Sequence, residues 1–133
     1  MTTPRTHAPL VERPRAIARG DLYWVTPDGT DPGMVGVAHP HVVVQEDVLN
    51  QSRITTVVVC ALTSNLERAH EPGNVLLEPH EGNLARQSVV VVSQVSSIPK
   101  AQLGALIGTL SAQRVDQVLA GLRFQQASFF NAR

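Results

Sequence analysis

The sequence predicts a small, mainly β domain: a β-barrel with one α-helix packed on it near the C-terminal end. Short runs rich in valine, isoleucine and threonine recur at close spacing, separated by clusters of glycine, proline and aspartate. One late segment has the apolar spacing of an amphipathic helix. A length of 133 residues, 43% hydrophobic and 17% charged, suits one folded domain with a single core.

The strands are expected to follow one another with short connections, because each run is β-branched and bounded by turn residues. The expected strands span residues 21–25, 41–45 (with Pro40 able to stand at the start), 55–63, 74–79, 88–97 and 105–110. The run "TTVVVCALT" at 55–63 is nearly all apolar, which is typical of a central strand covered on both faces. A long loop is expected at 27–36, a turn at 78–83 and one helical turn within 98–104.

The helix is expected over residues 111–124. The hydroxyl of Ser111 can cap its first turn. Four apolar side chains follow at the i, i+3, i+4, i+7 spacing of one helix face: Val115, Val118, Leu119 and Leu122. This face is expected to pack against the barrel.

The formal net charge is 0, but the charges are unevenly placed. The first 19 residues hold four arginines against one glutamate, which gives +3, and the remaining chain holds 7 basic and 10 acidic residues, which gives −3. This basic arm could touch a phosphate backbone or could simply be solvated. The bulk charge alone gives no argument for nucleic-acid binding.

The chain is expected to act in the cytoplasm, with no membrane association. Its single cysteine, Cys60, allows no internal disulfide, the N-terminal stretch has no apolar signal region, and the apolar runs are too short to span a bilayer. We expect three parts: a flexible basic arm over 1–18, the folded domain over 19–124 and a C-terminal tail over 125–133.

Several motifs, in order, resemble the MazF/PemK family of toxins. They are "RGDLYWV", "HPHVVVQED", "TTVVVCALTSNLERA", "NVLL", "GNLARQSVVVVSQV" and "LGALIGTLS", which run from about Arg19 to Leu122. The resemblance implies an SH3-like β-barrel of the plasmid-maintenance toxin type with a C-terminal helix. It also implies a homodimer, neutralised by an antitoxin protein whose extended segment covers the toxin's groove.

The activity that the resemblance implies is cleavage of single-stranded RNA by attack of the RNA's own 2′-hydroxyl, with no metal and no cofactor. Such a reaction needs help in moving two protons and donors where negative charge grows on the phosphate. The family keeps an arginine before the proline of the second strand and a threonine at the end of the third. The threonine is present as Thr63, whereas His39 stands in the arginine's position.

This replacement changes the chemistry that the position can offer. Arginine is always charged, and its planar guanidinium can donate two hydrogen bonds to one phosphate. An unperturbed histidine titrates near pH ~6.5 and can transfer protons. His41 lies two residues on, so in a strand it faces the same side as His39 and could supply the second proton transfer. The alternative is a non-catalytic relative that only binds an antitoxin or nucleic acid.

Further positions are compared with the family pattern. Gln45, Asn65 and Gln94 match it and, with Ser64 beside Thr63, are the expected RNA contacts; the alternative for each amide is a surface group satisfied by nearby backbone. Gln87 stands where the family commonly has an acidic residue. Ser96 stands where it commonly has an arginine, so with His39 up to two cationic groups expected to face RNA are missing, which weakens phosphate binding.

A metal site and a nucleophilic cysteine are the alternative interpretations of the remaining reactive residues. The pair His39 and His41, with His70 and His80, offers imidazoles, but no spacing motif fixes a third ligand, so no metal is expected. Cys60 lies in the most apolar strand and is expected to be a buried small hydrophobe.

Overall fold

The computed structural model describes residues 16–26 and 37–127. Six strands form one antiparallel sheet: β1 (Asp21–Val25), β2 (His39–Val43), β3 (Thr56–Thr63), β4 (Val75–Leu77), β5 (Ser88–Pro99) and β6 (Leu103–Thr109). The helical elements are α2 (Asp47–Asn50), η3 (Leu66–His70), η4 (Glu81–Asn83), η5 (Lys100–Gln102) and α3 (Ala112–Gln125). The predicted fold class, mainly β with a terminal helix, is confirmed.

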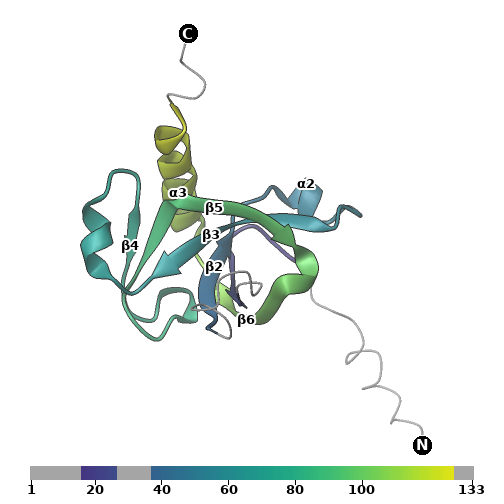
Figure 1. Ribbon diagram of the computed structural model, residues 1–133, viewed down its shortest axis with the longest axis horizontal. Coiled ribbons are helices and arrows are strands. Elements are labelled where there is room, and N and C mark those ends of the chain that lie inside the picture. Colours follow the sequence, from purple (N-terminus) through teal and green to yellow (C-terminus); the bar gives the residue numbers. More distant parts are fainter. Residues whose placement is uncertain (1–15, 27–36, 128–133) are drawn as a thin grey trace, which may run out of the picture.

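The strand order is β4-β5-β3-β2-β1-β6, and the sheet curls so that β5 arches over the inner strands (Figure 1). The two outermost strands, β4 and β6, are joined through η4 in the described part of the chain. The Asn83 side-chain amide donates to the carbonyl of Ile107 on β6 at 2.8 Å. The backbone of Gly82 lies so close to Gly108 that a Cβ added to Gly108 would collide with the Gly82 carbonyl oxygen.

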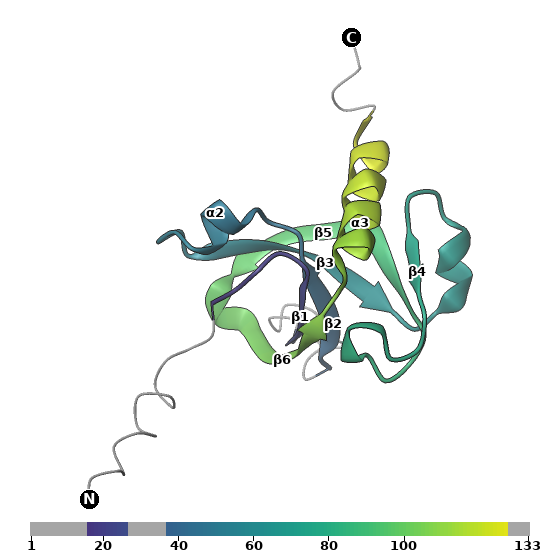
Figure 2. The same ribbon diagram turned by 180° about the vertical axis from the view of Figure 1, so that it is seen from behind.

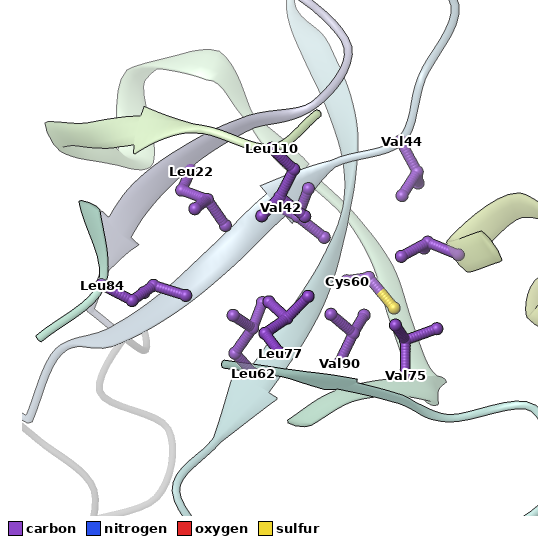
Figure 3. Close-up of a cluster of buried hydrophobic side chains, with 11 residues drawn as sticks. Leu22, Val42, Val44, Cys60, Leu62, Val75, Leu77, Leu84, Val90 and Leu110 are labelled. Carbon is purple, nitrogen blue, oxygen red and sulfur yellow. The ribbon is translucent and has the colours of Figure 1, made fainter. Parts of the chain in front are cut away.

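Two apolar clusters cover opposite faces of the central strands. The larger cluster, shown in Figure 3, gathers side chains from β1 to β5 with Val118 of α3: Leu22, Val42, Val44, Cys60, Leu62, Val75, Leu77, Leu84, Val90, Leu110 and Val118. The smaller cluster holds Tyr23, Val43, Val57 and Val59. Since alternate β3 residues point into the two clusters, the prediction of a central strand covered on both faces is confirmed.

The strand β5 changes its surroundings half-way along. Its first five residues, Ser88–Val92, are buried, whereas most of the rest is partly or fully exposed. The register with β3 shifts between Cys60 and Leu62, where several β5 residues lie opposite Ala61. Such an irregularity bends the strand and increases its twist. The bend lets β5 follow the curl of the sheet and pair with β3 on both sides of the shift.

The terminal helix α3 packs against β5 and β4, and it stands at one side of the sheet in both views (Figures 1 and 2). The Ser111 hydroxyl accepts from the Arg114 backbone N–H at 3.2 Å, which confirms the predicted cap. The helix approaches the Gly73 turn closely, and a Cβ on Gly121 would lie 2.0 Å from the Gly73 carbonyl oxygen. Glycine at 121 is therefore a packing requirement.

The second strand differs from the prediction. It spans His39–Val43 and not 41–45, and Pro40 lies inside it. The pairing with β1 includes Pro40, but the pairing with β3 begins only at His41. Pro40 therefore lies where only one neighbouring strand is paired, so its missing N–H is tolerated.

The remaining expectations have mixed outcomes. The strands expected at 55–63, 74–79, 88–97 and 105–110 are present with ends shifted by at most two residues, and the expected helical turn is η5. The sequence did not predict α2 or η3, and the loop expected at 27–36 lies outside the described residues. Within the described chain, no helix is both long enough and apolar enough to cross a membrane.

Candidate functional site

A pocket of about 630 Å³ opens where β2 and β5 begin and β3 ends. Its polar lining is formed by His39, Thr63, Ser64, Asn83, Arg86 and Ser88. The apolar lining includes Trp24, Pro40, Leu62, Leu84, Leu106 and Ile107. No carboxylate belongs to the lining formed by the described residues, which suits an anionic ligand.

The strand register brings His39 and Thr63 to the same level. Residues of β2 and β3 pair antiparallel, with His41 opposite Ala61. Continuing this register by two residues brings His39 level with Thr63 on the neighbouring strand. The structure therefore gathers in one pocket the two residues that the sequence nominated first.

The Thr63 hydroxyl is held by the backbone that follows it. Its Oγ1 accepts a hydrogen bond from the Asn65 backbone N–H at 3.1 Å. Because this bond uses an oxygen lone pair, the hydroxyl proton remains able to point into the pocket and donate. Thr63 is therefore suited to donate to a phosphate oxygen.

His39 is half-buried and has a polar atom without a partner. Its Nε2 is fully covered and makes no hydrogen bond within the described part of the chain. A covered nitrogen without a partner loses the hydrogen bonds that water would give it.

His41 lies near His39 but does not line the pocket. Its Nδ1 lies 3.0 Å from the His39 carbonyl oxygen, so the Nδ1–H donates to this carbonyl. Burial lowers the pKa of His41, the hydrogen bond to His39 raises it in part, and the charge of the neighbouring His39 lowers it again. The neutral form of His41 is therefore favoured, with its proton on Nδ1.

The four predicted RNA contacts are placed differently. Ser64 lines the pocket, whereas the side chain of Asn65 caps η3 by accepting from the Glu67 backbone N–H at 3.2 Å. Gln94 is exposed on β5 and does not line the pocket. Gln45 is only 8% exposed, and its amide donates to Asn50 Oδ1 at 2.9 Å. The structure therefore gives Gln45 an internal role that ties β2 to α2.

Trp24 and Arg86 are the two most chemically distinctive lining residues that were not nominated from the sequence. Trp24 is 42% exposed on β1, at the rim of the pocket, and Arg86 is exposed just before β5. An exposed tryptophan at position 24 would be signalled by its outward place in the strand pattern. Arg86 gives a weaker signal, since an arginine in a loop has no periodicity.

Cys60 is buried, as predicted. Its Sγ–H donates to the Val91 carbonyl at 3.1 Å, and burial raises the pKa of the thiol to about 12. The thiolate is therefore absent at neutral pH, which excludes a nucleophilic role. Within the described residues, no three His, Cys, Asp or Glu side chains gather closely enough to hold a metal ion.

Comparison with known proteins identifies the family. The model of the PemK-like, MazF-like toxins of type II toxin–antitoxin systems matches residues 18–125. The chain belongs to this family. Its curated relatives include the endoribonuclease MazF6 of Mycobacterium tuberculosis, 36% identical over 110 residues that cover 80% of this chain and 94% of the relative. Endoribonuclease EndoA of Bacillus subtilis is 27% identical over 111 residues, covering 84% and 95%.

Solved structures of the family share the fold. A mycobacterial endoribonuclease, determined in complex with its cognate antitoxin, superposes with a TM-score of 0.69 at 20% identity, covering 84% of this chain and 96% of that one. MazF of Deinococcus radiodurans gives a TM-score of 0.68 at 18% identity, covering 86% and 99%. These likenesses show that the chain has the fold of MazF toxins.

Proposed function

We propose that this MazF-family chain is an endoribonuclease toxin that cleaves single-stranded RNA without a metal or cofactor, in the cytoplasm, as a homodimer. The observation that carries the proposal is the pocket that holds His39 and Thr63 at neighbouring strand ends, with no carboxylate in its described lining. The endoribonuclease names of the curated relatives support it.

The proposed reaction needs no group from outside the RNA except protons. The 2′-oxygen attacks the adjacent phosphorus, the bond from phosphorus to the 5′-oxygen breaks, and a 2′,3′-cyclic phosphate and a 5′-hydroxyl result. The Thr63 hydroxyl donates to a non-bridging phosphate oxygen, where charge grows. His39 carries out one of the two proton transfers, and solvent in the open pocket carries out the other.

His41 has a supporting role in this proposal. Its imidazole is committed through Nδ1 to the His39 carbonyl and does not reach the pocket lining. It therefore holds the backbone of His39 in place and takes no part in proton transfer in this proposal. Ser64 remains a proposed RNA contact, Asn65 acts through its N–H on Thr63, and Gln94 stays a prediction from the resemblance.

The antitoxin is proposed to cover the same pocket. A family toxin structure was determined with its cognate antitoxin bound, which supports an antitoxin partner for this chain. The pocket's apolar rim, with Trp24 and Leu106 each about 40% exposed, suits the apolar side chains of an extended segment.

A second function is favoured by one observation, the histidine at position 39 where the family resemblance implies an arginine. The loss of a permanent cation at this position would weaken stabilisation of the transition state. A chain in which this loss has ended catalysis would still bind an antitoxin or nucleic acid.

A fluorogenic RNA assay of the wild type, His39→Ala and His39→Arg across pH 5 to 9 separates the two functions. We expect the wild type to cleave, with a limb in the pH range where histidines titrate, and His39→Ala to lose about 10²–10⁴-fold in rate. The exposed His70 gives the matched control, His70→Ala, which should cleave like the wild type.

Two other results would have different meanings. An inert wild type that gains cleavage through His39→Arg supports the non-catalytic function. A wild type that cleaves with a flat pH profile and tolerates His39→Ala contradicts a role for His39 in either case.

A further inference from the structure

Arg86 is the one permanently charged side chain among the described residues that line the pocket. It follows η4 and precedes β5, whose residue Val89 pairs with Thr63 of β3. Only two residues therefore lie between Arg86 and the residue opposite Thr63, and the side chains of Arg86 and Thr63 line one pocket. This places a cation beside the proposed phosphate donor.

The backbone that carries Arg86 is fixed on both sides. Before it, Leu84 is buried in the larger cluster, and the Asn83 amide is bonded to the Ile107 carbonyl of β6. After it, the Ser88 hydroxyl donates to the Arg86 carbonyl at 3.0 Å. Because the backbone is held while the side chain is exposed, the guanidinium is presented from a rigid base.

The charge of Arg86 is not neutralised by an ion pair in the described part of the chain. The two ion pairs there use Arg68 with Glu71 and Arg114 with Glu81. The carboxylate of Glu78 accepts from the neutral amide of Gln87 at 3.3 Å. Gln87 itself is neutral, and because Arg86 has no ion-pair partner within the described chain, its guanidinium is available to an anion.

We propose that Arg86 binds the phosphate at the cleaved bond and so supplies the permanent positive charge that His39 does not. The inference rests on the proposed function, because it names a phosphate-binding residue for that same pocket. A guanidinium offers a planar fork of N–H donors that matches two phosphate oxygens. In this arrangement His39 moves a proton, Thr63 donates one hydrogen bond, and Arg86 holds the phosphate.

The test measures binding separately from cleavage. The probe is a pool of short single-stranded RNAs of random sequence with 2′-O-methyl riboses, which remove the attacking hydroxyl, and binding is followed by fluorescence anisotropy at several salt concentrations. The proteins are the wild type, Arg86→Gln, Arg86→Lys and the control Arg53→Gln. Arg53 is exposed in the loop before β3, so the length of that strand separates it from Thr63.

We expect Arg86→Gln to weaken binding about tenfold or more, since hydrogen bonds to charged groups are among the stronger ones. The slope of log affinity against log salt should fall by about 0.7, the value for one phosphate contact on a single strand. Arg86→Lys should keep the slope and lose part of the affinity, because it keeps the charge but not the fork. Arg53→Gln should match the wild type in both.

Two results would overturn the proposal: Arg86→Gln binding with wild-type affinity and slope, or a wild type that does not bind the pool. Thermal unfolding of each variant excludes loss of folding as the cause. A parallel assay with unmodified RNA should show a rate loss of about 10²–10³-fold for Arg86→Gln. If the wild type cleaves no RNA but the binding results hold, the proposed function fails and the assignment of Arg86 stands.

Discussion

At the scale of single residues, the two histidines of "HPH" have separate surroundings although they lie two residues apart. His39 lines the pocket, whereas His41 lies outside the lining, with its Nδ1–H on the carbonyl of His39. The lowered pKa of His41, caused first by burial, makes protonation of this side chain unfavourable to the folded state. It follows that His41 makes stability depend on pH.

The sign of this dependence follows from the lowered pKa. In the unfolded chain, His41 binds a proton once the pH falls below the ordinary histidine pKa of ~6.5. In the folded chain, His41 binds this proton only at lower pH, so acidification favours the unfolded state. We predict that the free energy of unfolding falls between pH 7 and pH 5, and that His41→Gln makes this fall smaller. Urea unfolding at both pH values measures it, with the exposed His70→Gln as the control. An identical fall in wild type and His41→Gln would contradict the prediction.

The sequence located part of the site at this scale. Thr63 and His39 were nominated because the motifs around them resemble the family pattern, and the structure brings these two strand ends to one pocket. Gln45 was misplaced because a sequence does not reveal that Asn50, five residues on, satisfies its amide and backbone. Arg86 was missed because its place in the pocket depends on how η4 folds over β6.

At the scale of elements, α3 and η4 are joined by a two-pronged ion pair. Arg114 donates through Nε and Nη2 to the two carboxylate oxygens of Glu81, each at 2.8 Å. Arg114 lowers the pKa of Glu81 through these bonds. Since η4 leads into the segment that carries Arg86, this ion pair links the terminal helix to the pocket.

We predict that Arg114→Gln destabilises the protein by about 1 kcal/mol, the upper range for an ion pair that remains about a quarter exposed. The depressed pKa of Glu81 means that this contribution is present above its ordinary pKa and is lost as pH falls through the lowered one. Urea unfolding should therefore show a larger difference between wild type and Arg114→Gln at pH 7 than at pH 3. Arg68→Gln, which breaks the exposed pair with Glu71 on one short helix, should cost less; an equal loss would contradict a special role for the α3–η4 link.

The long elements were predictable and the short ones were not. Valine-rich strands and the capped amphipathic helix carry repeated signals along the chain, so their type was clear. The four residues of α2 and the five of η3 are too short for any periodicity. The η4 turn depends on left-handed backbone at His80, Gly82 and Asn83, of which the glycine is the strongest signal of such a conformation and the histidine a weak one.

At the scale of the whole molecule, the pocket lies where η4 connects the two outermost strands of the curled sheet. The fluorescence of one tryptophan can show whether the pocket is occupied. Trp24 is the single tryptophan of the 133 residues, and it is 42% exposed at the pocket rim. Any ligand that covers the pocket should change the surroundings of this indole. Intrinsic fluorescence therefore tests occupancy without a label.

We predict that the extended C-terminal segment of the cognate antitoxin shifts the Trp24 emission to shorter wavelength and displaces 2′-O-methyl RNA from the pocket. The indole would move from a partly wet rim into contact with apolar side chains of the peptide. The chain after residue 19 is net −3, so attraction to an acidic segment is small. Peptide binding should therefore depend weakly on salt, whereas RNA binding should weaken steeply as salt rises.

Light scattering first measures the molar mass of the toxin, which should be that of a dimer. The peptide is then titrated into the toxin at low and at high salt. Trp24→Phe is the control, because it should bind the peptide by calorimetry while giving no tryptophan signal. A peptide that saturates the toxin yet leaves both the Trp24 emission and the bound RNA unchanged would place the antitoxin elsewhere. In that case the antitoxin would not inhibit by covering the pocket. It would have to bind another surface and change the RNA site through a change in the toxin's conformation.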